Sequence, residues 1–578
     1  MSEFEPIHVE AVNPNIGDLA QWDSTFGWDK AREILGWPKD KFNIGWYCTD
    51  RICEQGKGDK VALIWESADG KDVRRYTFND LRVLANAYAQ FFTENLGLKP
   101  GDRCAIFTER TPELYISILG GLKAGLVMLP MFSAFGEEAL AARVGPSGAR
   151  AIITQRKLCF RVRKIREQCP ELKHVLIGQP GDLQFEPGEV HFDLDVAAPV
   201  EHFEPYPADE ETRSVLHYTS GTTGLPKGAQ HVHGSLPQQA LTTLWVLDVR
   251  DEDVYWCTAD PGWVTGVSYG IIGPWSLGVT QLVLECGFIV DRWYKALQDY
   301  QVTVWYSAPT AIRLLMKEGA EKVKQFDLSH LRHLCSVGEP LNPEAVVWSH
   351  ETYGLPFFDT WWQTETGAIQ ITNLPGMEIR PGSMGKPFPG CTAAVLDDKG
   401  KAITEPEESG QLALQPPWPS MFREYFKEPT KYESKFNNGW YLTGDRARID
   451  KDGYFWFMGR DDDVINTGGH LVGPFEVESA LLEHEAVAES AAIGKPDEEM
   501  MEVVKAFVAL KPGFEPSRKL EMSIMSHIRK KLSPLAMPQE IEFVDKLPKT
   551  RSGKIMRRLL RAQEWGEEIG DTSTLEDD

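Results

Sequence analysis

The sequence predicts an α/β protein, with a large N-terminal domain of parallel-sheet α/β subdomains plus a β subdomain and a small α+β C-terminal domain. Short apolar runs alternate with amphipathic stretches from residue 61 to residue 154. Short β-like segments with Gly and Pro turns fill residues 382–463, and a compact mixture of helix and strand patterns follows. We therefore divide the chain into residues 1–55, 56–460, 461–570 and 571–578.

The N-terminal part alternates between expected strands and helices. Residues 1–55 carry four tryptophans among acidic residues without a repeating pattern, and we interpret them as a helical extension packed on the large domain. The expected strands are 61–65, 103–108, 126–130 and 151–154, and the expected helices are 78–95, 112–124 and 137–144. This alternation indicates a sheet whose strands run largely parallel.

Four expected strands in the middle of the chain end in loops rich in polar and aromatic residues. The strands 254–258, 302–306, 331–337 and 357–358 lead into the loops 259–266, 307–310, 338–340 and 359–367. Ligands of parallel α/β sheets bind outside the carboxyl ends of the strands. A pocket is therefore expected at these strand ends.

The last part of the chain shows two changes in its sequence pattern, from β-like segments to a mixture of helices and strands and then to a polar tail. Residues 410–414 and 453–458 are expected strands of the β subdomain. The small domain is expected to contain helices 474–482 and 519–531 and strands 489–493, 505–510 and 540–544. Residues 571–578 are acidic and polar, and we expect a disordered tail there.

Composition excludes several classes of protein. The 578 residues carry a net charge of −24, which disfavours a general role in binding nucleic acid or an acidic membrane. Two apolar stretches, 114–132 and 270–290, are interrupted by charged residues or proline and are expected in the core. Nine cysteines without metal-type pairs and a start without secretory features predict a cytoplasmic protein.

One stretch is typical of a phosphate site. Tyr218 to Gly228 combines glycines, which permit close backbone approach, with hydroxyl donors and the Lys227 ammonium. It is not the common loop of strand-loop-helix ATPases, because Gly228 rather than Ser or Thr follows Lys227. Read alone, the stretch also fits a flexible surface linker.

Three motifs in this order resemble the adenylate-forming (ANL) superfamily, which includes acyl-CoA synthetases, peptide-synthetase adenylation domains and luciferases. They are the stretch 218–228, residues 441–445 with Gly459-Arg460 following, and residues 548–554. Read alone, residues 443–445 fit a common turn, and the basic run from Arg551 fits a solvated tail. Their co-occurrence favours the functional interpretation.

Within this superfamily the chain resembles the AMP-forming acetyl-CoA synthetases. The segments that carry this resemblance are residues 260–266, 337–343 and 359–367. The family converts ATP and acetate to an acetyl adenylate and pyrophosphate, and CoA then displaces AMP to give acetyl-CoA. The same reactions run in reverse would form ATP.

The resemblance assigns the nucleotide site residue by residue. Glu365 would bind Mg²⁺, a hard cation suited to carboxylate and phosphate oxygens, and Thr364 would contact the α-phosphate. Asp445 would bind the ribose hydroxyls, with Arg460 beside it. The β- and γ-phosphates would be held by Thr219, Ser220, Gly221, Thr222, Thr223, Gly224 and Lys227. The adenine side and the rest of the nucleotide wall would comprise Gly338, Glu339, Pro340, Asp359, Thr360, Trp361 and Gln363.

Lys554 resembles the lysine that serves adenylation. Its ammonium would bridge the attacking carboxylate and the α-phosphate and neutralise the charge that develops between them. Acetylation of Lys554 would remove that charge, so a lysine acetyltransferase and deacetylase are expected partners.

The size of the acid follows from Trp362. In the resemblance this side chain closes the acyl pocket, with Val264, Thr265 and Val337 forming the remaining wall, so little room remains beyond a methyl group. One methylene in a tight pocket is discriminated by about 1–3 kcal/mol, so propionate should react more weakly than acetate. The alternative for Trp362 is simple core filling.

The CoA site implied by the resemblance lies on both domains. Asp462 matches the hinge about which the small domain rotates after adenylation. Ser133, Ala134, Gly468 and Gly469 would line the pantetheine tunnel, and Arg529 would meet the 3′-phosphate. Arg161 and Arg163 are further candidates for nucleotide contacts, although the surrounding sequence departs from the family there.

One residue departs from the family pattern. Leu471 stands where the family usually carries an arginine, eleven residues after Arg460. Our hypothesis is that the missing charge alters the balance of the half-reactions toward ATP formation. The rival functions are a ligase for propionate or another short acid and, outside the enzymes, a non-catalytic nucleotide-binding scaffold.

Overall fold

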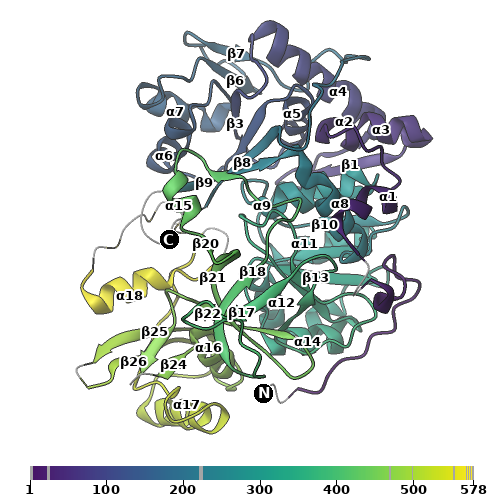
Figure 1. Cartoon of the computed structure of the whole chain (residues 1–578). Coiled ribbons are helices and arrows are strands. Elements are labelled where there is room, and N and C mark those ends of the chain that lie inside the picture. The colour runs from purple at the N-terminus through teal and green to yellow at the C-terminus, as the bar shows by residue number, and fades with distance from the viewer. Residues whose placement is uncertain are drawn as a thin grey trace.

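Three β-sheets organise the part of the chain that the computed structural model describes, namely residues 4–22, 26–219, 226–467, 470–497, 499–550, 554–567, 569, 572 and 575. Two of the sheets form the large N-terminal part, and the third lies in the small C-terminal part at one end of the molecule (Figure 1). The mixed α/β fold with a large and a small domain is therefore confirmed. Most of the predicted tail, residues 571–578, lies outside the described residues.

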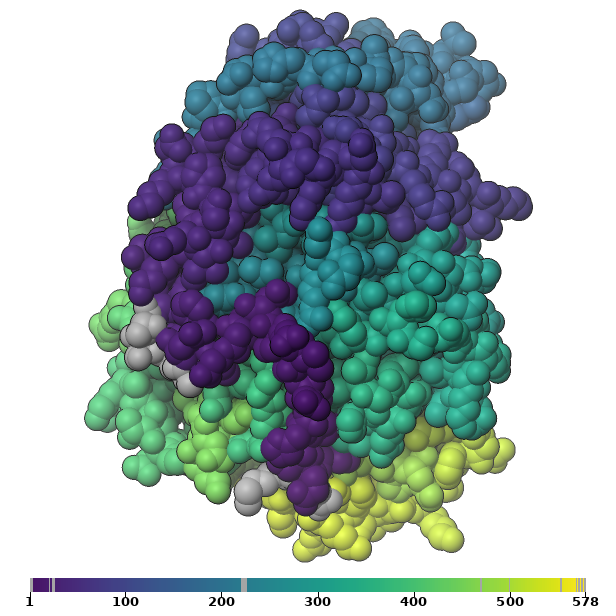
Figure 2. All heavy atoms as spheres, turned by 90° about the vertical axis from the view of Figure 1, so that its right-hand side faces the viewer, coloured from purple at the N-terminus to yellow at the C-terminus, as the bar shows by residue number. Residues whose placement is uncertain are grey.

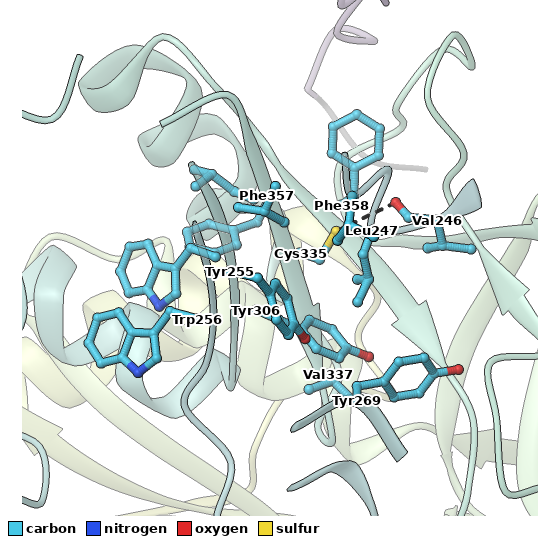
Figure 3. Close-up of a cluster of buried hydrophobic side chains, with 14 of the residues drawn as sticks. Val246, Leu247, Tyr255, Trp256, Tyr269, Tyr306, Cys335, Val337, Phe357 and Phe358 are labelled. Atoms are coloured by element: carbon cyan, nitrogen blue, oxygen red, sulfur yellow. Dashed lines mark hydrogen bonds between the residues drawn. The ribbon is translucent and has the colours of Figure 1, made fainter. Parts of the chain in front are cut away.

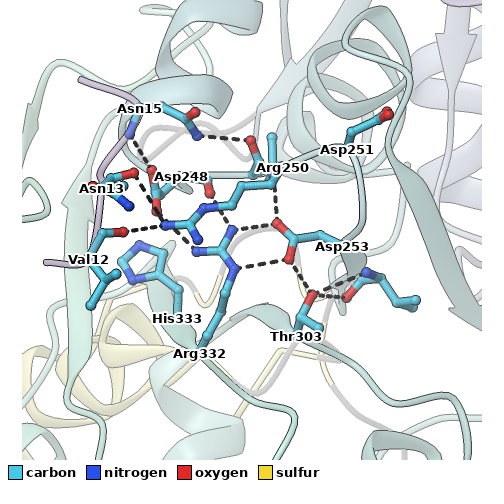
Figure 4. Close-up of polar contacts among 12 residues, drawn as sticks. Val12, Asn13, Asn15, Asp248, Arg250, Asp251, Asp253, Thr303, Arg332 and His333 are labelled. Carbon is cyan, nitrogen blue, oxygen red and sulfur yellow. Dashed lines mark hydrogen bonds and ion pairs between the residues drawn. The ribbon is translucent and has the colours of Figure 1, made fainter. Parts of the chain in front are cut away.

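The N-terminal extension runs along the outside of the large part (Figure 2). Its helical segments are short: η1 (Leu19–Gln21), η2 (Trp28–Lys30), α1 (Ala31–Ile34), α2 (Ile44–Cys48), α3 (Asp50–Ile52) and η3 (Cys53–Lys57). Asn15 N donates to Asp248 at 2.7 Å, and Arg250 donates to the Val12 carbonyl at 2.7 Å (Figure 4). Arg332 pairs with Asp248 in the same cluster, so polar contacts anchor the extension.

The first sheet has eight strands in the order β19-β9-β8-β4-β3-β5-β6-β7. Its strands are β3 (Arg103–Phe107), β4 (Val127–Pro130), β5 (Ala151–Gln155), β6 (His174–Gly178), β7 (Glu189–His191), β8 (Arg213–Thr219), β9 (Lys227–Val232) and β19 (Glu424–Tyr425). Strands β3 to β8 pair in parallel, whereas β9 and β19 are antiparallel. The helices of this part are α4 (Phe78–Gln90), η4 (Phe91–Asn95), α5 (Pro112–Lys123), α6 (Glu137–Ser147), α7 (Arg156–Ile165) and η5 (Arg166–Gln168).

The second sheet joins a parallel half to an antiparallel half. Its order is β17-β18-β21-β22-β16-β15-β14-β13-β12-β10-β11-β1-β2, with β20 beside β21. The first group of strands is β1 (Val61–Glu66), β2 (Val73–Thr77), β10 (Val254–Cys257), β11 (Thr280–Leu284), β12 (Val304–Ser307), β13 (His333–Val337) and β14 (Phe357–Trp361). The second group is β15 (Ile371–Thr372), β16 (Ser383–Pro387), β17 (Ala393–Leu396), β18 (Ser409–Leu414), β20 (Phe436–Asn437), β21 (Trp440–Ile449) and β22 (Phe455–Arg460). The expected β subdomain is thus continuous with the parallel strands, because β15 pairs with the edge of β14.

The helices around the second sheet include one segment that was expected to be a loop. They are η6 (His233–Ser235), α8 (Leu236–Trp245), α9 (Val264–Val267), η7 (Ser268–Ile272), α10 (Gly273–Ser276), α11 (Val290–Asp299), α12 (Pro309–Glu318), α13 (Ala320–Val323) and α14 (Pro343–Tyr353), whereas α15 (Pro429–Glu433) packs beside β19 of the first sheet. The loop prediction was wrong for residues 264–266, which begin α9. Burial of the whole run from Thr265 to Ser276 outweighs the weak helix propensity of its glycines.

A second correction concerns residues 359–361. They were expected in a loop, but they continue strand β14, because Ser336 and Val337 of β13 pair with Asp359 and Thr360. The sequence shows only two apolar residues before this polar run, so the strand depends on its neighbour.

The small C-terminal part contains the third sheet, in the order β24-β23-β26-β25 with β27 beside β26. Its elements are β23 (Ile465–Thr467), β24 (His470–Val472), α16 (Pro474–Leu482), β25 (Val487–Asp497), β26 (Met501–Leu510), α17 (Arg518–Lys531), β27 (Glu540–Phe543) and α18 (Arg557–Trp565). Ile465, Val477, Val504 and Ile524 belong to a core of its own.

The largest core of the described chain lies against the parallel half of the second sheet. Trp256 and Trp305 stack with ring centroids 6.0 Å apart, and Tyr255, Tyr306 and Phe357 pack in the same cluster (Figure 3). Among the described residues, no helix combines the length and the apolar character needed to cross a membrane.

Candidate active site

A cavity of about 1710 Å³ lies between the carboxyl ends of β12, β13 and β14 and the small C-terminal domain. Its walls contain predicted site residues from distant parts of the chain: Ser133, Thr219, Lys227, Val264, Thr265, Val337, Gly338, Glu339, Pro340, Asp359, Thr360, Trp361, Trp362, Gln363, Thr364, Glu365, Asp445, Arg460, Asp462 and Lys554. The fold therefore brings these side chains to one place.

Part of the predicted phosphate loop is outside the described residues. The same holds for one pair of glycines, and these positions together are Ser220, Gly221, Thr222, Thr223, Gly224, Gly468 and Gly469. The described ends of the loop, Thr219 and Lys227, are paired across β8 and β9, and both line the cavity. The loop thus starts and ends at the cavity wall.

Asp445 is a buried carboxylate surrounded by donors. Its Oδ2 accepts hydrogen bonds from Trp361 at 3.1 Å and Gln363 at 2.9 Å, and its Oδ1 accepts from Arg460 at 3.1 Å. Burial raises the pKa of Asp445, and the charge of Arg460 opposes that rise. Gly444 has a φ of +79°, and a Cβ there would stand 3.2 Å from the Arg460 guanidinium, so this turn requires glycine.

Trp362 follows the last residue of β14 and lines the cavity. Its side chain is buried, with 9% of its surface exposed, and its ring meets Tyr269 edge-on at 5.1 Å. Its indole nitrogen donates to the Tyr306 hydroxyl at 3.3 Å. Tyr306 and Tyr269 lie at the same end of the buried cluster as Val337 (Figure 3). Val264 and Thr265 at the start of α9 line the cavity together with Val337, Tyr306 and Trp362, and we call this part of the cavity wall the recess.

The wall next to β13 carries two carboxyl groups in different settings. Glu339 forms an ion pair with Arg313 at 2.7 Å and accepts from Thr310 at 2.8 Å, so its orientation is set. Asp359 is buried and accepts from the Thr360 amide at 3.0 Å. Burial raises the pKa of Asp359 to about 7, so this carboxyl changes its charge near neutral pH.

The opposite side of the cavity gathers cations around Glu365. Tyr425 donates to Glu365 at 2.7 Å, and the Lys227 ammonium lies 5.7 Å from the centre of the Tyr425 ring. Lys435 also lines the cavity there, and its side chain makes no hydrogen bond or ion pair with a described residue. Burial lowers the pKa of Lys435, whereas the negative charge of Glu365 raises it.

Lys435 was not among the site residues predicted from the sequence. It lies ten residues before Asp445, in a stretch that matches no motif, and strand β20 and the turn after it return the chain toward the cavity. Tyr306 and Tyr425 were also not predicted, because neither belongs to a recognisable motif. Each is an ordinary strand aromatic in sequence, and only its neighbours in space show a role.

Lys554 reaches the cavity from the small domain. The Thr550 amide donates to the Lys554 carbonyl at 2.7 Å, and the Lys554 amide donates to the Thr550 hydroxyl at 3.1 Å, so hydrogen bonds hold the backbone of Lys554 against Thr550. The charge of Lys554 acts on Asp445 and partly offsets the rise in its pKa. The small domain therefore places a cation near Asp445. Residues 551–553 lie outside the described residues.

The predicted CoA residues are spread out. Arg161 donates to the carbonyls of Ser133 and Phe135, at 3.1 Å each, and so supports the rim of the cavity. Arg163 pairs with Glu189 at 2.7 Å. Four predicted residues do not line the cavity of the described chain although they are described: Ala134, Arg161, Arg163 and Arg529. The structure thus does not bring Arg529, in the last turn of α17, to the other CoA candidates.

The predicted hinge lies between β22 and β23. Asp462 forms a long ion pair with Arg460 at 3.5 Å, and its carbonyl accepts from Arg561 at 2.9 Å. Leu471 lies on β24 with 48% of its surface exposed and does not line the cavity. The side chain that replaces the expected arginine is therefore on the outer surface in this arrangement of the two domains.

Comparison with known proteins matches almost the whole chain. Residues 50–426 match the family model of the AMP-binding enzyme, and residues 476–554 match that of the AMP-binding enzyme C-terminal domain. The acetyl-coenzyme A synthetase of Bacillus subtilis (strain 168) is 46% identical over 538 residues, which cover 93% of this chain and 93% of that protein.

Two solved structures are also similar. The crystal structure of a Brucella canis acyl-CoA synthetase has a TM-score of 0.73 at 36% identity, covering 95% of this chain and 99% of that chain. The crystal structure of the anthranilate CoA ligase AuaEII in complex with anthranoyl-AMP has a TM-score of 0.82 at 30% identity, covering 92% of this chain and 98% of that chain.

Proposed function

This chain belongs to the AMP-binding enzyme family, and we propose that it is an AMP-forming acetyl-CoA synthetase. The observation that carries the proposal is the cavity in which Asp445, Trp362 and Lys554 meet. Its contents match the two half-reactions of that activity, and the relative of the same activity is 46% identical over nearly the full chain.

The first half-reaction joins acetate to AMP. A carboxylate oxygen of acetate attacks the α-phosphorus of ATP, the bond to the β-phosphate oxygen breaks, and pyrophosphate leaves. Both reactants are anions, so the reaction needs cations and fixed donors around the phosphates. We assign this role to Lys554 between the carboxylate and the α-phosphate and to Thr364 at the α-phosphate, because both line the cavity.

The departing pyrophosphate would be held on the side of the cavity where the cations gather. Lys227 and Lys435 both line this side, and the loop that begins at Thr219 starts there. Lys435 makes no ion pair with a described residue, so its charge is available to a ligand. We therefore add Lys435 to the predicted phosphate contacts.

Glu365 fits the role of a magnesium ligand. Tyr425 occupies one of its oxygens, which leaves the other for a ligand. The described residues contain no group of three His, Cys, Asp or Glu that could hold a metal by protein ligands alone, and Mg²⁺ in such sites binds through one or two carboxylates and the substrate phosphates. When bound, Mg²⁺ neutralises part of the triphosphate charge. Tyr425 would meanwhile hold the carboxylate in place.

The nucleoside is assigned to the two carboxyl groups of the opposite wall and to Asp445. Asp445 accepts from three protein donors, and the charge of Arg460 favours its carboxylate form, so it can accept from ribose hydroxyls. Asp359 and the loop at Gly338 would face the adenine. An ionised Asp359 can accept from an amino group, whereas the protonated carboxyl accepts less well.

The second half-reaction transfers the acetyl group to CoA. The thiolate of CoA attacks the carbonyl carbon of the acetyl adenylate, and the bond to the phosphate oxygen breaks, which releases AMP. We propose that the small domain rotates about Asp462 between the two steps, because Lys554 lines the cavity in the present arrangement and is needed there only for the first step. The glycines 468 and 469 and Arg529 would then approach Ser133.

Two regulatory features belong to this proposal. Acetylation of Lys554 by a lysine acetyltransferase would remove its charge and stop adenylation, and a deacetylase would restore it. The exposed Leu471 would weaken phosphate affinity after rotation and favour the ATP-forming direction. All nine cysteines are free of disulfides, which supports a cytoplasmic location.

The proposal is tested by pyrophosphate release from ATP with acetate, propionate and butyrate, each with and without CoA. We expect acetate to have the highest kcat/KM, and propionate to follow by about 10–200-fold, the usual effect of one methylene in a tight pocket. A preference for propionate would assign the rival short-acid ligase. Absence of any acyl adenylate with all three acids would assign the non-catalytic scaffold.

A further inference from the structure

A series of hydrogen bonds starts at the indole of Trp362, which lines the cavity. The Trp362 indole nitrogen is 3.3 Å from the Tyr306 hydroxyl, which is 2.8 Å from the Thr360 hydroxyl, which is 2.7 Å from the Ser336 carbonyl. Tyr306 and Ser336 are fully buried, and Thr360 has 3% of its surface exposed. The four groups connect the edge of the cavity to the interior of the sheet.

The direction of every hydrogen bond in this chain is determined by its two ends. An indole nitrogen can only donate, and a backbone carbonyl can only accept. Trp362 therefore donates to Tyr306, Tyr306 donates to Thr360, and Thr360 donates to Ser336. Each hydroxyl gives its proton to the next member and accepts from the one before, so all three protons are used and no other arrangement satisfies the chain.

The last two groups of this series of hydrogen bonds, Thr360 and Ser336, lie on β14 and β13, which also carry other residues of the cavity wall. Val337 and Thr360 are partners in the register of β13 and β14, and so are Ser336 and Asp359. Val337 lines the recess beside Trp362, and Asp359 lines the nucleotide side. The hydrogen bonds therefore connect the Trp362 indole to β13 and β14, the pair of strands that carries Val337 and Asp359.

We propose that Tyr306 is a specificity-determining residue, which holds Trp362 at the depth that limits the length of the acyl group. This rests on the proposed function. An indole is held in one plane by packing, but its position along that plane needs a directional contact. Tyr306 supplies that contact, and Thr360 orients the Tyr306 hydroxyl. Neither residue touches the reacting atoms, so both act by positioning Trp362.

Tyr269 offers a matched comparison at the same indole. It also packs against Trp362, its hydroxyl is fully buried, and it has two partners, the Ile369 amide at 2.8 Å and the Thr242 hydroxyl at 2.8 Å. Its hydroxyl is outside the chain that starts at the indole nitrogen. Loss of that hydroxyl disturbs the packing layer as much, but it leaves the Trp362 donor satisfied.

The test compares Tyr306→Phe with Tyr269→Phe. For each, kcat/KM for acetate and for propionate is measured by pyrophosphate release at saturating ATP. We expect Tyr306→Phe to lower the acetate-to-propionate ratio about tenfold, a part of the discrimination that a tight pocket applies to one methylene. Tyr269→Phe should change the ratio by less than about twofold, because its hydroxyl does not hold the indole. An unchanged ratio in Tyr306→Phe, or an equal fall in both variants, overturns the proposal.

A second pair of variants tests the middle of the chain. Thr360→Val removes the acceptor for Tyr306, whereas Thr360→Ser keeps it. We expect Thr360→Val to lower the ratio and Thr360→Ser to retain it, so that the conservative variant rescues specificity even if Tyr306→Phe does not fold. If the acetate-to-propionate ratio fell equally in both Thr360 variants, the proposed role of these hydrogen bonds would be refuted.

Failure of the proposed function would look different. If the unmodified protein forms no acyl adenylate from any short acid, the ligase assignment fails before any variant is compared. If it forms acetyl adenylate and the variants leave the ratio unchanged, the ligase assignment stands and only the proposed positioning of Trp362 by Tyr306 fails.

Discussion

The cavity wall on β13 and β14 and the side supplied by the small domain are built differently. Thr360 and Val337 are buried in the wall, which is held by strand pairing and by directional hydrogen bonds. The small domain meets the large domain through contacts such as Asn342 to Ser479 at 3.0 Å, and its Lys554 is exposed. The wall on β13 and β14 is thus held rigidly, whereas the proposed adenylating cation is on a separate domain, for which we propose a rotation.

The largest expected effect concerns the mobile side. Lys554→Gln removes the cation while leaving the wall intact, and one donor aimed at developing charge is worth about 10²–10³ in kcat. We expect adenylation, followed as acetate-dependent exchange of pyrophosphate into ATP, to fall by about that factor. Thioester formation from added acetyl adenylate should stay within about twofold of the unmodified rate, because CoA attack does not use this lysine.

The control for this comparison is Lys495→Gln. Lys495 is another lysine of the small domain, paired with Glu540 at 2.5 Å, and it does not line the cavity. If both half-reactions fell together in Lys554→Gln, the division of labour between the two sides would be wrong.

A smaller effect is expected for the cation on the large domain. Lys435→Met should raise the KM for ATP about tenfold, since a charge-assisted contact to a phosphate contributes about 1.5–3 kcal/mol. Lys431→Met, four residues earlier, removes a lysine that already pairs with Glu428 at 2.7 Å and should leave that KM unchanged. Steady-state kinetics at varied ATP decide this, and equal KM values in the two variants would remove Lys435 from the phosphate site.

The wall also predicts a pH dependence. Burial raises the pKa of Asp359 from 3.8 to about 7, so between these values the folded protein binds more protons than the unfolded chain. Stability should therefore fall as pH rises through this window, by at most about 1.4 kcal/mol per pH unit. Thermal unfolding of Asp359→Asn, measured from pH 5 to pH 8, should show a flatter slope than the unmodified protein. A slope that Asp359→Asn leaves unchanged would assign the dependence to another group.

The smallest effect is expected at the contact between the two domains. Ser479→Ala removes one hydrogen bond to Asn342, and an ordinary hydrogen bond contributes about 0.5–1.5 kcal/mol. Adenylation should fall about threefold, because the arrangement that places Lys554 in the cavity loses part of its stabilisation. The control is Ser523→Ala, whose hydroxyl contacts His484 at 3.1 Å within the small domain. A larger effect of the control would show that the domain contact does not set the rate.

Much of the fold could be predicted from local patterns. Helix 474–482 was placed with both ends correct, because Gly473 and Pro474 mark its start and its apolar residues recur at helical spacing. Strand 103–107 was found within one residue, since a buried parallel strand is a continuous apolar run. The resemblance to adenylate-forming enzymes is confirmed by the family models, because the motifs that carry it are short and contiguous.

The misses have a common cause. Residues 359–361 form a strand only because β13 supplies hydrogen-bond partners, and residues 264–266 form a helix because the surrounding core buries them. Lys435 and Tyr306 belong to the site because of neighbours that lie ten to more than fifty residues away in the chain. The amino acids next to each of these residues in the sequence do not indicate which distant residues it will contact after folding.

The sequence by itself determined the alternation of strands and helices, the small domain that follows them, and the presence of Asp445, Trp362 and Lys554. These depend on residue type and on spacing along the chain. Only the tertiary structure decided how Trp362 is held, that Lys435 lies near Glu365, and that Lys554 lies near Asp445. The reason is physical. A hydrogen bond or an ion pair depends on distance in space, and folding brings together groups that the sequence keeps far apart.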